Sequence, residues 1–250
     1  NCAGPMTVLN TIVADQLIKF KKDVDTLIEK NLDKDEAIFQ VLRKYIVESR
    51  KIRFEGNGYS EEWVKEAEKR GLSNFKTTPE ALGAFNTKQA IELFERNGIM
   101  SEREQHARYD IALETYTKKI QIESRIIADT VKSLLIPSAI KYQSSLIENV
   151  KGLKEVLTAE EYKKHSKIPL QIITEISERI SILNTKVHEM IEARKKANAI
   201  TDAKKQALDY CKNVKEEYFD LIRYHADKLE LLVDDESWPL PKYREMLFTK

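Results

Sequence analysis

Ser101–Leu157, SEREQHARYDIALETYTKKIQIESRIIADTVKSLLIPSAIKYQSSLIENVKGLKEVL, is the stretch that decides the fold of this chain. It contains one proline, Pro137, and one glycine, Gly152. Its apolar residues recur at steps of three and four, which is the period of one helix face. They are Ile120, Ile127, Val131, Leu134, Leu146, Val150, Leu153 and Leu157. The pattern therefore predicts one very long amphipathic helix.

The start and the middle of this helix carry their own signals. Ser101 followed by Glu104 is typical of a capping box, in which each side chain accepts a hydrogen bond from the other residue's backbone. A straight helix of this length would extend about 85 Å at 1.5 Å per residue. Pro137 lacks an N–H and crowds the carbonyl four residues before it, so we expect a kink just before it. Because so long an apolar stripe must be covered, other helices are expected to pack along it.

The flanking sequence supplies those partner helices. Helices are expected to start at or just after Met6, Asp33, Ser60, Thr78, Thr87, Thr158, Pro169 and Asp202. We predict an all-α fold, a long antiparallel helical bundle with a kinked central helix and short flanking helices. About three quarters or more of the residues should be helical. The expected core comprises Ile127, Val131, Leu134, Ile176, Ile180, Leu183, Val214, Leu221 and Leu232.

The same signals divide the chain into three parts. Residues 1–100 form a helical segment, and residues 101–235 form the long-helix bundle. Residues 236–250 form an extended tail, because Trp238-Pro239-Leu240-Pro241 cannot continue a helix. We expect the tail to dock its aromatic side chains on the bundle or on a neighbouring chain.

Composition and charge exclude several classes of protein. With 33% charged and 42% hydrophobic residues, seven glycines and six prolines, the chain suits a helix-rich globular protein. A formal net charge of +1 selects neither nucleic acid nor an anionic membrane as partner. No apolar run approaches the roughly 20 residues of a membrane span, and no signal-peptide pattern is visible. Cys2 and Cys211 are far apart and are typical of a reduced, cytoplasmic protein.

One segment of the N-terminal part has the residue types of a functional loop. Arg53, Glu55, Asn57 and Tyr59 alternate around Gly56 and Gly58. Glycine lets the backbone approach a partner closely, and loops are where binding residues concentrate. The segment is not a dinucleotide fingerprint, because Glu61 stands where a third glycine would fall. Two interpretations stay open: a loop that supports a substrate site, and a turn whose glycines only permit the chain to reverse.

The sequence contains no self-contained catalytic or metal-binding pattern. A di-iron bundle needs Glu-x-x-His, but other residues precede the four histidines by three positions. They are Arg103, Tyr162, Thr185 and Ile222. We interpret the histidines as surface or packing residues rather than ligands, and Cys211 as a buried small side chain rather than a reactive thiol. We therefore predict no catalytic residue and no metal site in this chain.

Several segments, in order, resemble the C-terminal part of a type III glutamine synthetase. They are Ala3-Gly4-Pro5 with Val8–Asp15, Phe54–Trp63, Glu66–Leu72, Thr77–Leu82, Trp238–Pro241, Tyr243 and Leu247-Phe248. The resemblance implies that the chain starts just downstream of the main active site, and that residues 1–100 continue from a missing N-terminal catalytic domain. It also implies that the complete enzyme joins ammonia to glutamate with ATP and Mg or Mn, and forms a homo-oligomer. The metal carboxylates of that family fall on segments that this sequence lacks.

Two classes of function remain open. The first is the helical part of an ATP-dependent ligase, which supports the catalytic domain and subunit assembly without being catalytic alone. The second is a non-catalytic helical-bundle interaction or scaffold module. The order of the matching segments favours the first. Neither interpretation requires a cofactor bound by this chain itself, a nucleic acid or a membrane.

Overall fold

The computed structural model describes residues 2–248, and these residues are built from helices. The chain is 80% helical and the described part has no β-strand, which confirms the predicted all-α fold and helix content. It divides into two compact units, Asn1–Ala112 and Leu113–Lys250. Asn1 of the predicted N-terminal segment, and Thr249 and Lys250 of the predicted tail, lie outside the described residues.

Helices in the first unit begin and end at the residues that can cap them. The Asp33 carboxylate accepts from the Asp35 N–H at 3.0 Å, and Ser60 Oγ accepts from the Trp63 N–H at 3.3 Å. Gly71 and Gly98 follow helix ends with φ of 69° and 64°. The elements are α1 (Ala3–Ile28), α2 (Lys34–Glu48), the 3₁₀ turn η1 (Ser49–Ile52), α3 (Glu61–Lys69), α4 (Thr78–Phe85), α5 (Lys88–Arg96) and the first turns of α6 (Glu102–Asp129).

Two helix starts of this unit differ from the prediction by one turn or less. α1 begins at Ala3 and not at Met6, so that Pro5 lies in the first turn, where its missing N–H costs no helical bond. α4 begins at Thr78, so Thr77 and not Thr78 is at the N-cap position and Pro79 is second in the helix; the Thr77 side chain makes no capping hydrogen bond to the backbone.

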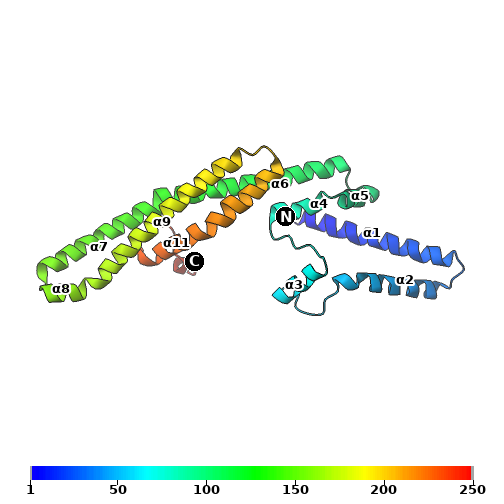
Figure 1. Cartoon of the computed structure of the whole chain (residues 1–250), viewed down its shortest axis with the longest axis horizontal. Coiled ribbons are helices and arrows are strands. Elements are labelled where there is room, and N and C mark those ends of the chain that lie inside the picture. The colour runs from blue at the N-terminus through cyan, green and yellow to red at the C-terminus, as the bar shows by residue number, and fades with distance from the viewer. Residues whose placement is uncertain (1, 249–250) are drawn as a thin grey trace. The chain divides into compact units, whose positions relative to one another are not determined.

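α1 and α2 pack as an antiparallel pair around a small core (Figure 1). The chain reverses through Asn31, whose φ is 63°. Val24, Ala37 and Val41 are buried between the two helices. Phe20, Leu27, Leu32, Ile38 and Tyr45 pack around them. The first half of α1 extends beyond this core, so that most of its large apolar side chains are exposed.

The second unit is an antiparallel bundle of three helical runs (Figure 1). α6 continues through a π-helical segment into α7, which gives one helix of 55 residues that begins at the predicted Ser101–Glu104 capping box. α8 follows the predicted Thr158–Glu161 capping box and reverses the chain. The runs are α6–η2 (Thr130–Leu135)–α7 (Ile136–Val156), then α8 (Ala159–His165) and α9 (Lys167–Asn198), then α10 (Ala203–Asp209)–η3 (Tyr210–Phe219)–α11 (Asp220–Leu232). Because α9 starts at Lys167, Pro169 lies in its first turn and not before the helix as predicted.

Two π-helical segments decide which residues reach the core of the bundle. In η2 the Ile136 N–H bonds to the Val131 carbonyl five residues back, just before Pro137, which has no N–H to donate. At the place of the kink predicted just before Pro137, the helix therefore contains a wider, π-helical turn. Val131 is buried, but the next buried position is Leu135, and the predicted core residue Leu134 is 41% exposed.

The second π-helical segment, η3, also shifts the core by one residue from the predicted position. Val214 is buried and the next fully buried position is Ile222, whereas the predicted Leu221 is 37% exposed. A wider turn moves every following residue around the helix axis, so a strict 3.6-residue period gives the wrong member of each pair. Ile176 and Leu183 are buried as predicted, and Ile127, Ile180 and Leu232 pack against the core.

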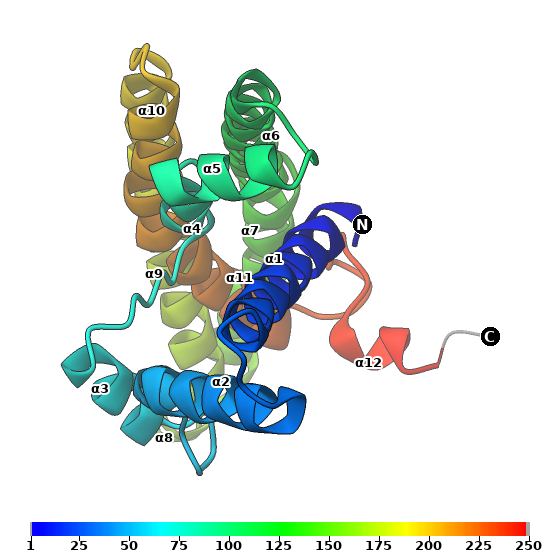
Figure 2. The same cartoon turned by 90° about the vertical axis from the view of Figure 1, so that its right-hand side faces the viewer.

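The tail docks one aromatic residue on the bundle and then forms a last short helix. Trp238 is 7% exposed and belongs to the core cluster. Beyond the two prolines, α12 (Tyr243–Met246) projects from the side of the bundle, drawn in red in Figure 2. The described part of the tail thus begins in a turn, has no regular secondary structure from Trp238 to Lys242, and ends in a helix.

Candidate functional site

The loop Arg53–Ser60 presents the four candidate side chains to solvent. Arg53, Glu55, Asn57 and Tyr59 are all exposed, and Tyr59 is 100% exposed. Asn57 Oδ1 accepts a hydrogen bond from the Tyr59 N–H at 3.0 Å, which is an Asx turn. Within the described residues no hydrogen bond or ion pair joins two of the four side chains. The structure therefore does not gather them into a site by themselves.

The base of this loop is a stack of three side chains. The rings of Phe54 and Trp63 stack at 4.5 Å between centroids, and the Arg70 guanidinium lies 5.4 Å from the Trp63 ring. Arg70 also donates to the Arg53 carbonyl at 2.7 Å and pairs with Glu66 at 2.8 Å. Arg70 therefore fixes the backbone from which the four candidates project. No local sequence pattern marks Arg70 for this role.

Gly56 is required by packing in this loop rather than by an unusual φ. A Cβ at position 56 would lie 2.7 Å from Cε1 of the Phe54 ring. Gly58 has open space around it, with nothing within 4 Å of such a Cβ. Of the two glycines, one therefore maintains the stack beneath the loop. A role of the four exposed residues in a substrate site stays a prediction.

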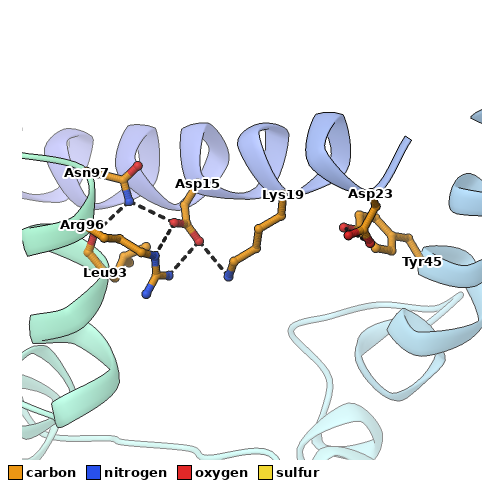
Figure 3. A network of polar contacts seen from close by, with 7 residues as sticks. All are labelled: Asp15, Lys19, Asp23, Tyr45, Leu93, Arg96 and Asn97. Carbon is orange, nitrogen blue, oxygen red and sulfur yellow. Dashed lines mark hydrogen bonds and ion pairs between the residues drawn. The ribbon is translucent and has the colours of Figure 1, made fainter. Parts of the chain in front are cut away.

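The most concentrated polar network of the first unit surrounds Asp15 (Figure 3). The Asp15 carboxylate accepts two hydrogen bonds from Arg96, at 2.6 and 2.8 Å, and one from Asn97 at 3.0 Å. Lys19, one turn further along α1, lies 2.8 Å from it. Asp15 is 6% exposed, and the hydrogen bonds from Arg96 and then Lys19 hold the pKa of its carboxyl far below the ordinary value of 3.8. This clamp joins α1 to α5.

The sequence contains a signal that Asp15 is buried and needs a partner. Asp15 falls on the same face of α1 as Thr11, which is also buried, and a carboxylate at an inward position needs a partner. Nothing local identifies Arg96 as that partner, because it lies 81 residues further along the chain. A second carboxylate of α1, Asp23, accepts from Lys44 at 3.2 Å and Tyr45 at 3.1 Å of α2.

In the bundle, the surroundings of His225 favour its neutral form. It is 8% exposed, and Nδ1 lies 3.0 Å from Nη1 of Arg179. Because a guanidinium only donates, Nδ1 must accept and the ring proton is on Nε2. Burial, and then the Arg179 charge, lower the pKa of His225. The packing interpretation of this histidine agrees with these contacts.

The described residues bring together no group of three or more His, Cys, Asp or Glu side chains able to hold a metal ion. Within the same residues, no helix is both long enough and apolar enough to cross a membrane. The polar networks around Asp15, Asp23 and His225 are made by residues of the same chain, and in the last of them Nε of Arg179 is buried without a partner among the described residues. Their chemistry is that of structural clamps.

Comparison with known proteins identifies relatives of this chain. Residues 37–154 match the family model of the glutamine synthetase C-terminal domain. Along its whole length the chain is 45% identical, over 250 residues, to a protein named glutamine synthetase from Bacteroides fragilis (strain YCH46). The chain is similar to the C-terminal region of glutamine synthetases. The resemblance to the C-terminal region of the type III enzymes is thereby confirmed.

Two further relatives also match this chain over about a third of their own length. The type-3 glutamine synthetase of Dictyostelium discoideum is 29% identical over 250 residues, or 98% of this chain and 33% of the relative. The glutamine synthetase of Butyrivibrio fibrisolvens is 30% identical over 251 residues, or 98% and 35%. For the Bacteroides protein these shares are 100% and 34%. The chain spans about a third of the length of the curated relatives that it matches.

The match to the C-terminal domain model also divides the chain. It starts at Ala37, in the first turn of α2, so α1 precedes it entirely. The loop Arg53–Ser60, α3 to α6, η2 and most of α7 lie within it. The two helices that complete the bundle, α9 and α11, follow it. In sequence, α1 therefore precedes the matched region, although it packs on α2 and α5 within that region.

Proposed function

We propose that this chain is the C-terminal helical part of an enzyme that joins ammonia to glutamate with ATP. It supports the catalytic domain and subunit assembly and is not catalytic alone. The observation that carries the proposal is the match of the whole chain to a third of each glutamine synthetase relative. Metal-dependent ligation then falls to the part of the enzyme that this chain does not contain, and the enzyme is expected in the cytoplasm.

The exposed apolar stripe of α1 supports a role in holding the catalytic domain. Met6, Leu9, Val13 and Leu17 recur at steps of three and four, and they are 52%, 58%, 57% and 63% exposed. The opposite face carries Asp15, which binds α5. A helix that is apolar on its free face is normally buried by another element. Since α1 precedes the C-terminal domain match, the catalytic domain is the partner that we propose for this stripe.

The implied divalent metal does not fit the described residues. Its ligands would be clustered carboxylates, and these residues bring together no group of three or more His, Cys, Asp or Glu side chains. We therefore assign no step of the reaction to these residues. Arg53, Glu55, Asn57 and Tyr59 are proposed only as a supporting loop at the mouth of the active site of the complete enzyme.

Deletion in the full-length enzyme tests the proposal. We expect that removing residues 101–250 abolishes normal assembly and lowers glutamine formation, and that the isolated 250-residue chain neither makes glutamine nor hydrolyses ATP. Light scattering and glutamate- and ammonia-dependent phosphate release are the measurements. Unchanged assembly and activity after the deletion would remove the support role. Chelator-sensitive phosphate release by the isolated chain would show that it is catalytic.

The α1 stripe allows a finer test with a matched control. Leu9→Lys and Leu17→Lys place charges on the stripe, whereas Thr7→Lys places the same charge on another exposed face of α1. In the full-length enzyme we expect both stripe variants to lower stability and activity, and Thr7→Lys to retain them. In the isolated chain the stripe is already exposed, so the free energy of unfolding of all three variants should be within about 0.5 kcal/mol of that of the parent. Equal loss with all three variants would contradict a docking role of the stripe.

A further inference from the structure

A groove of about 920 Å³ follows the first turns of α9, in the second unit. Its lining comes from α8 and from the stretch of α9 between Lys167 and Arg179. This stretch lies next to α8, at the end of the bundle where the chain reverses (Figure 1). It extends about 18 Å at 1.5 Å per residue. A groove that follows one helix over such a length has the shape in which a second helix packs.

Four exposed residues of α9 form a stripe along this groove. Lys167, Gln171, Thr174 and Glu178 are all exposed, and all of them line the groove. Steps of four, three and four residues keep them on one face of the helix. In the reverse chain direction the steps are again four, three and four. The stripe therefore has the same spacing in both directions, with a cation at one end and a carboxylate at the other.

The two charged ends of the stripe are available to a partner. Within the described residues, no hydrogen bond or ion pair joins the side chain of Lys167 or Glu178 to another side chain. Lys163 of α8, which lines the cationic end of the groove, has none either. Glu175, the other carboxylate of the lining, is already paired with Arg179 at 3.0 Å. The charge that the groove offers is therefore positive at the end near α8 and negative at Glu178.

The stripe is its own electrostatic complement. In two antiparallel copies of α9, related by a two-fold axis between Gln171 and Thr174, Lys167 of each copy faces Glu178 of the other. Gln171 of each copy then faces Thr174 of the other, and the symmetry makes each of these contacts twice. In a parallel pair, lysine would face lysine and glutamate would face glutamate, which is unfavourable. The charge pattern therefore selects the antiparallel pair.

We propose that the groove face of α9, from Lys167 to Glu178, binds the same face of a second copy of this chain in an antiparallel pair. Leu170, which is 43% exposed in the groove, adds apolar contact beside the two-fold axis. Exposed ion pairs contribute little individually, so this contact decides which faces meet and is weak in a single pair of chains.

The proposal rests on the assembly role proposed above and names one contact of that assembly. Its tests measure association and not glutamine formation. A failure of this contact would leave the ligase proposal standing, and a full-length enzyme that is inactive for other reasons would leave the contact standing.

Charge reversal tests the contact in the 250-residue chain. Lys167→Glu places glutamate opposite glutamate at both ends of the pair, and Glu178→Lys places lysine opposite lysine. We expect either variant to weaken self-association at least about tenfold in sedimentation equilibrium at low ionic strength, because two attractions become two repulsions. Added salt should weaken the association of the parent, since it screens exposed charges. A parent that stays monomeric at low ionic strength and millimolar concentration would overturn the proposal.

A matched control separates this contact from an effect of net charge. Lys196→Glu makes the same reversal at an exposed position near the other end of α9, outside the groove. Because Lys167 and Lys196 are both exposed, neither reversal should disturb the fold. We expect Lys196→Glu to associate as the parent does. An equal loss of association in Lys167→Glu and Lys196→Glu would overturn the assignment of the groove.

Restoring the complementary charges tests the antiparallel register itself. The double variant Lys167→Glu/Glu178→Lys exchanges the two charges, so it should associate as the parent does. A mixture of the two single variants brings glutamate opposite lysine at both ends, but only between chains of different kind. We expect the mixture to associate, whereas each single variant alone does not. A double variant or a mixture that associates no better than the single variants would overturn the proposal.

Discussion

The two units of this chain differ in how completely they bury their own apolar surface. In the bundle, Ile176, Leu183, Val187, Met190, Val214 and Leu229 are all fully buried. In the first unit, the α1–α2 pair buries Val24, Ala37 and Val41 and leaves the stripe from Met6 to Leu17 exposed. The bundle has the core of an independently stable domain. The first unit depends on clamps such as Asp15–Arg96 and, by our proposal, on a partner outside the chain.

The largest expected effect is on the stability of the bundle. Leu183→Ala should destabilise the second unit by about 2–5 kcal/mol, because it removes a fully buried side chain. Leu221→Ala changes the same residue type at a position that is 37% exposed, and should cost less than about 1 kcal/mol. Thermal unfolding followed by circular dichroism measures both. Similar losses in the two variants would mean that the π-helical shift of register is wrong.

The Asp15 clamp is the next largest effect and belongs to the first unit. Asp15→Asn keeps the size of the side chain but removes the charge that Arg96 and Lys19 neutralise, so we expect a loss of about 1–3 kcal/mol. Amide hydrogen exchange should show reduced protection in α1 and α5 and little change in the protection of α9. Uniform loss across both units would contradict a clamp that stabilises the first unit alone.

The same carboxylate should make the first unit acid-sensitive. Its folded-state pKa is lowered, so the unfolded chain binds more protons below the ordinary pKa of 3.8. The stabilisation is present above that pH and is lost as the pH falls below it. Asp15→Asn should flatten this part of the pH profile. A parent and variant with parallel acid unfolding curves would refute the clamp.

His225 predicts a smaller pH effect, in the bundle and at higher pH. Its pKa is lowered in the folded state, so the unfolded chain takes up the proton first as the pH falls below the ordinary value of 6.5. The contribution is fully present above that pH and declines below it. His225→Gln, which can still accept from Arg179, should remove this slope. Stability of the parent that is independent of pH between 7 and 5 would count against the buried neutral form.

The smallest effects on stability are expected in the loop Arg53–Ser60. Asn57→Ala and Tyr59→Ala alter exposed side chains, and should leave the melting temperature of the full-length enzyme nearly unchanged. If the loop supports the active site, they raise substrate KM values or lower turnover. Gly56→Ala is the contrasting variant, because its Cβ would meet the Phe54 ring and lower stability. Full activity of both alanine variants with loss of stability would make the loop structural.

Much of the fold follows from local sequence signals. Capping at Ser60, Ser101 and Thr158, and helix ends before Gly71 and Gly98, depend on residues within one turn of each other. The all-α class and the long helix follow from a period that spans many residues. The candidate loop was also found locally, from its glycines and polar residues. What it binds was not, because the four candidate side chains make no bond to one another, and the hydrogen bond of Asn57 Oδ1 is to the Tyr59 N–H of the same loop.

The sequence by itself determined the helices, their caps and the family resemblance, because each rests on neighbouring residues or on their order. Only the tertiary structure decided which side chains are inside. The two π-helical segments moved the core from Leu134 to Leu135 and from Leu221 to Ile222. Arg96, the partner of Asp15, likewise lies far from it in the chain. A periodicity argument assumes a constant number of residues per helical turn, and local spacing carries no information about residues far apart in the chain. These features therefore depend on tertiary packing.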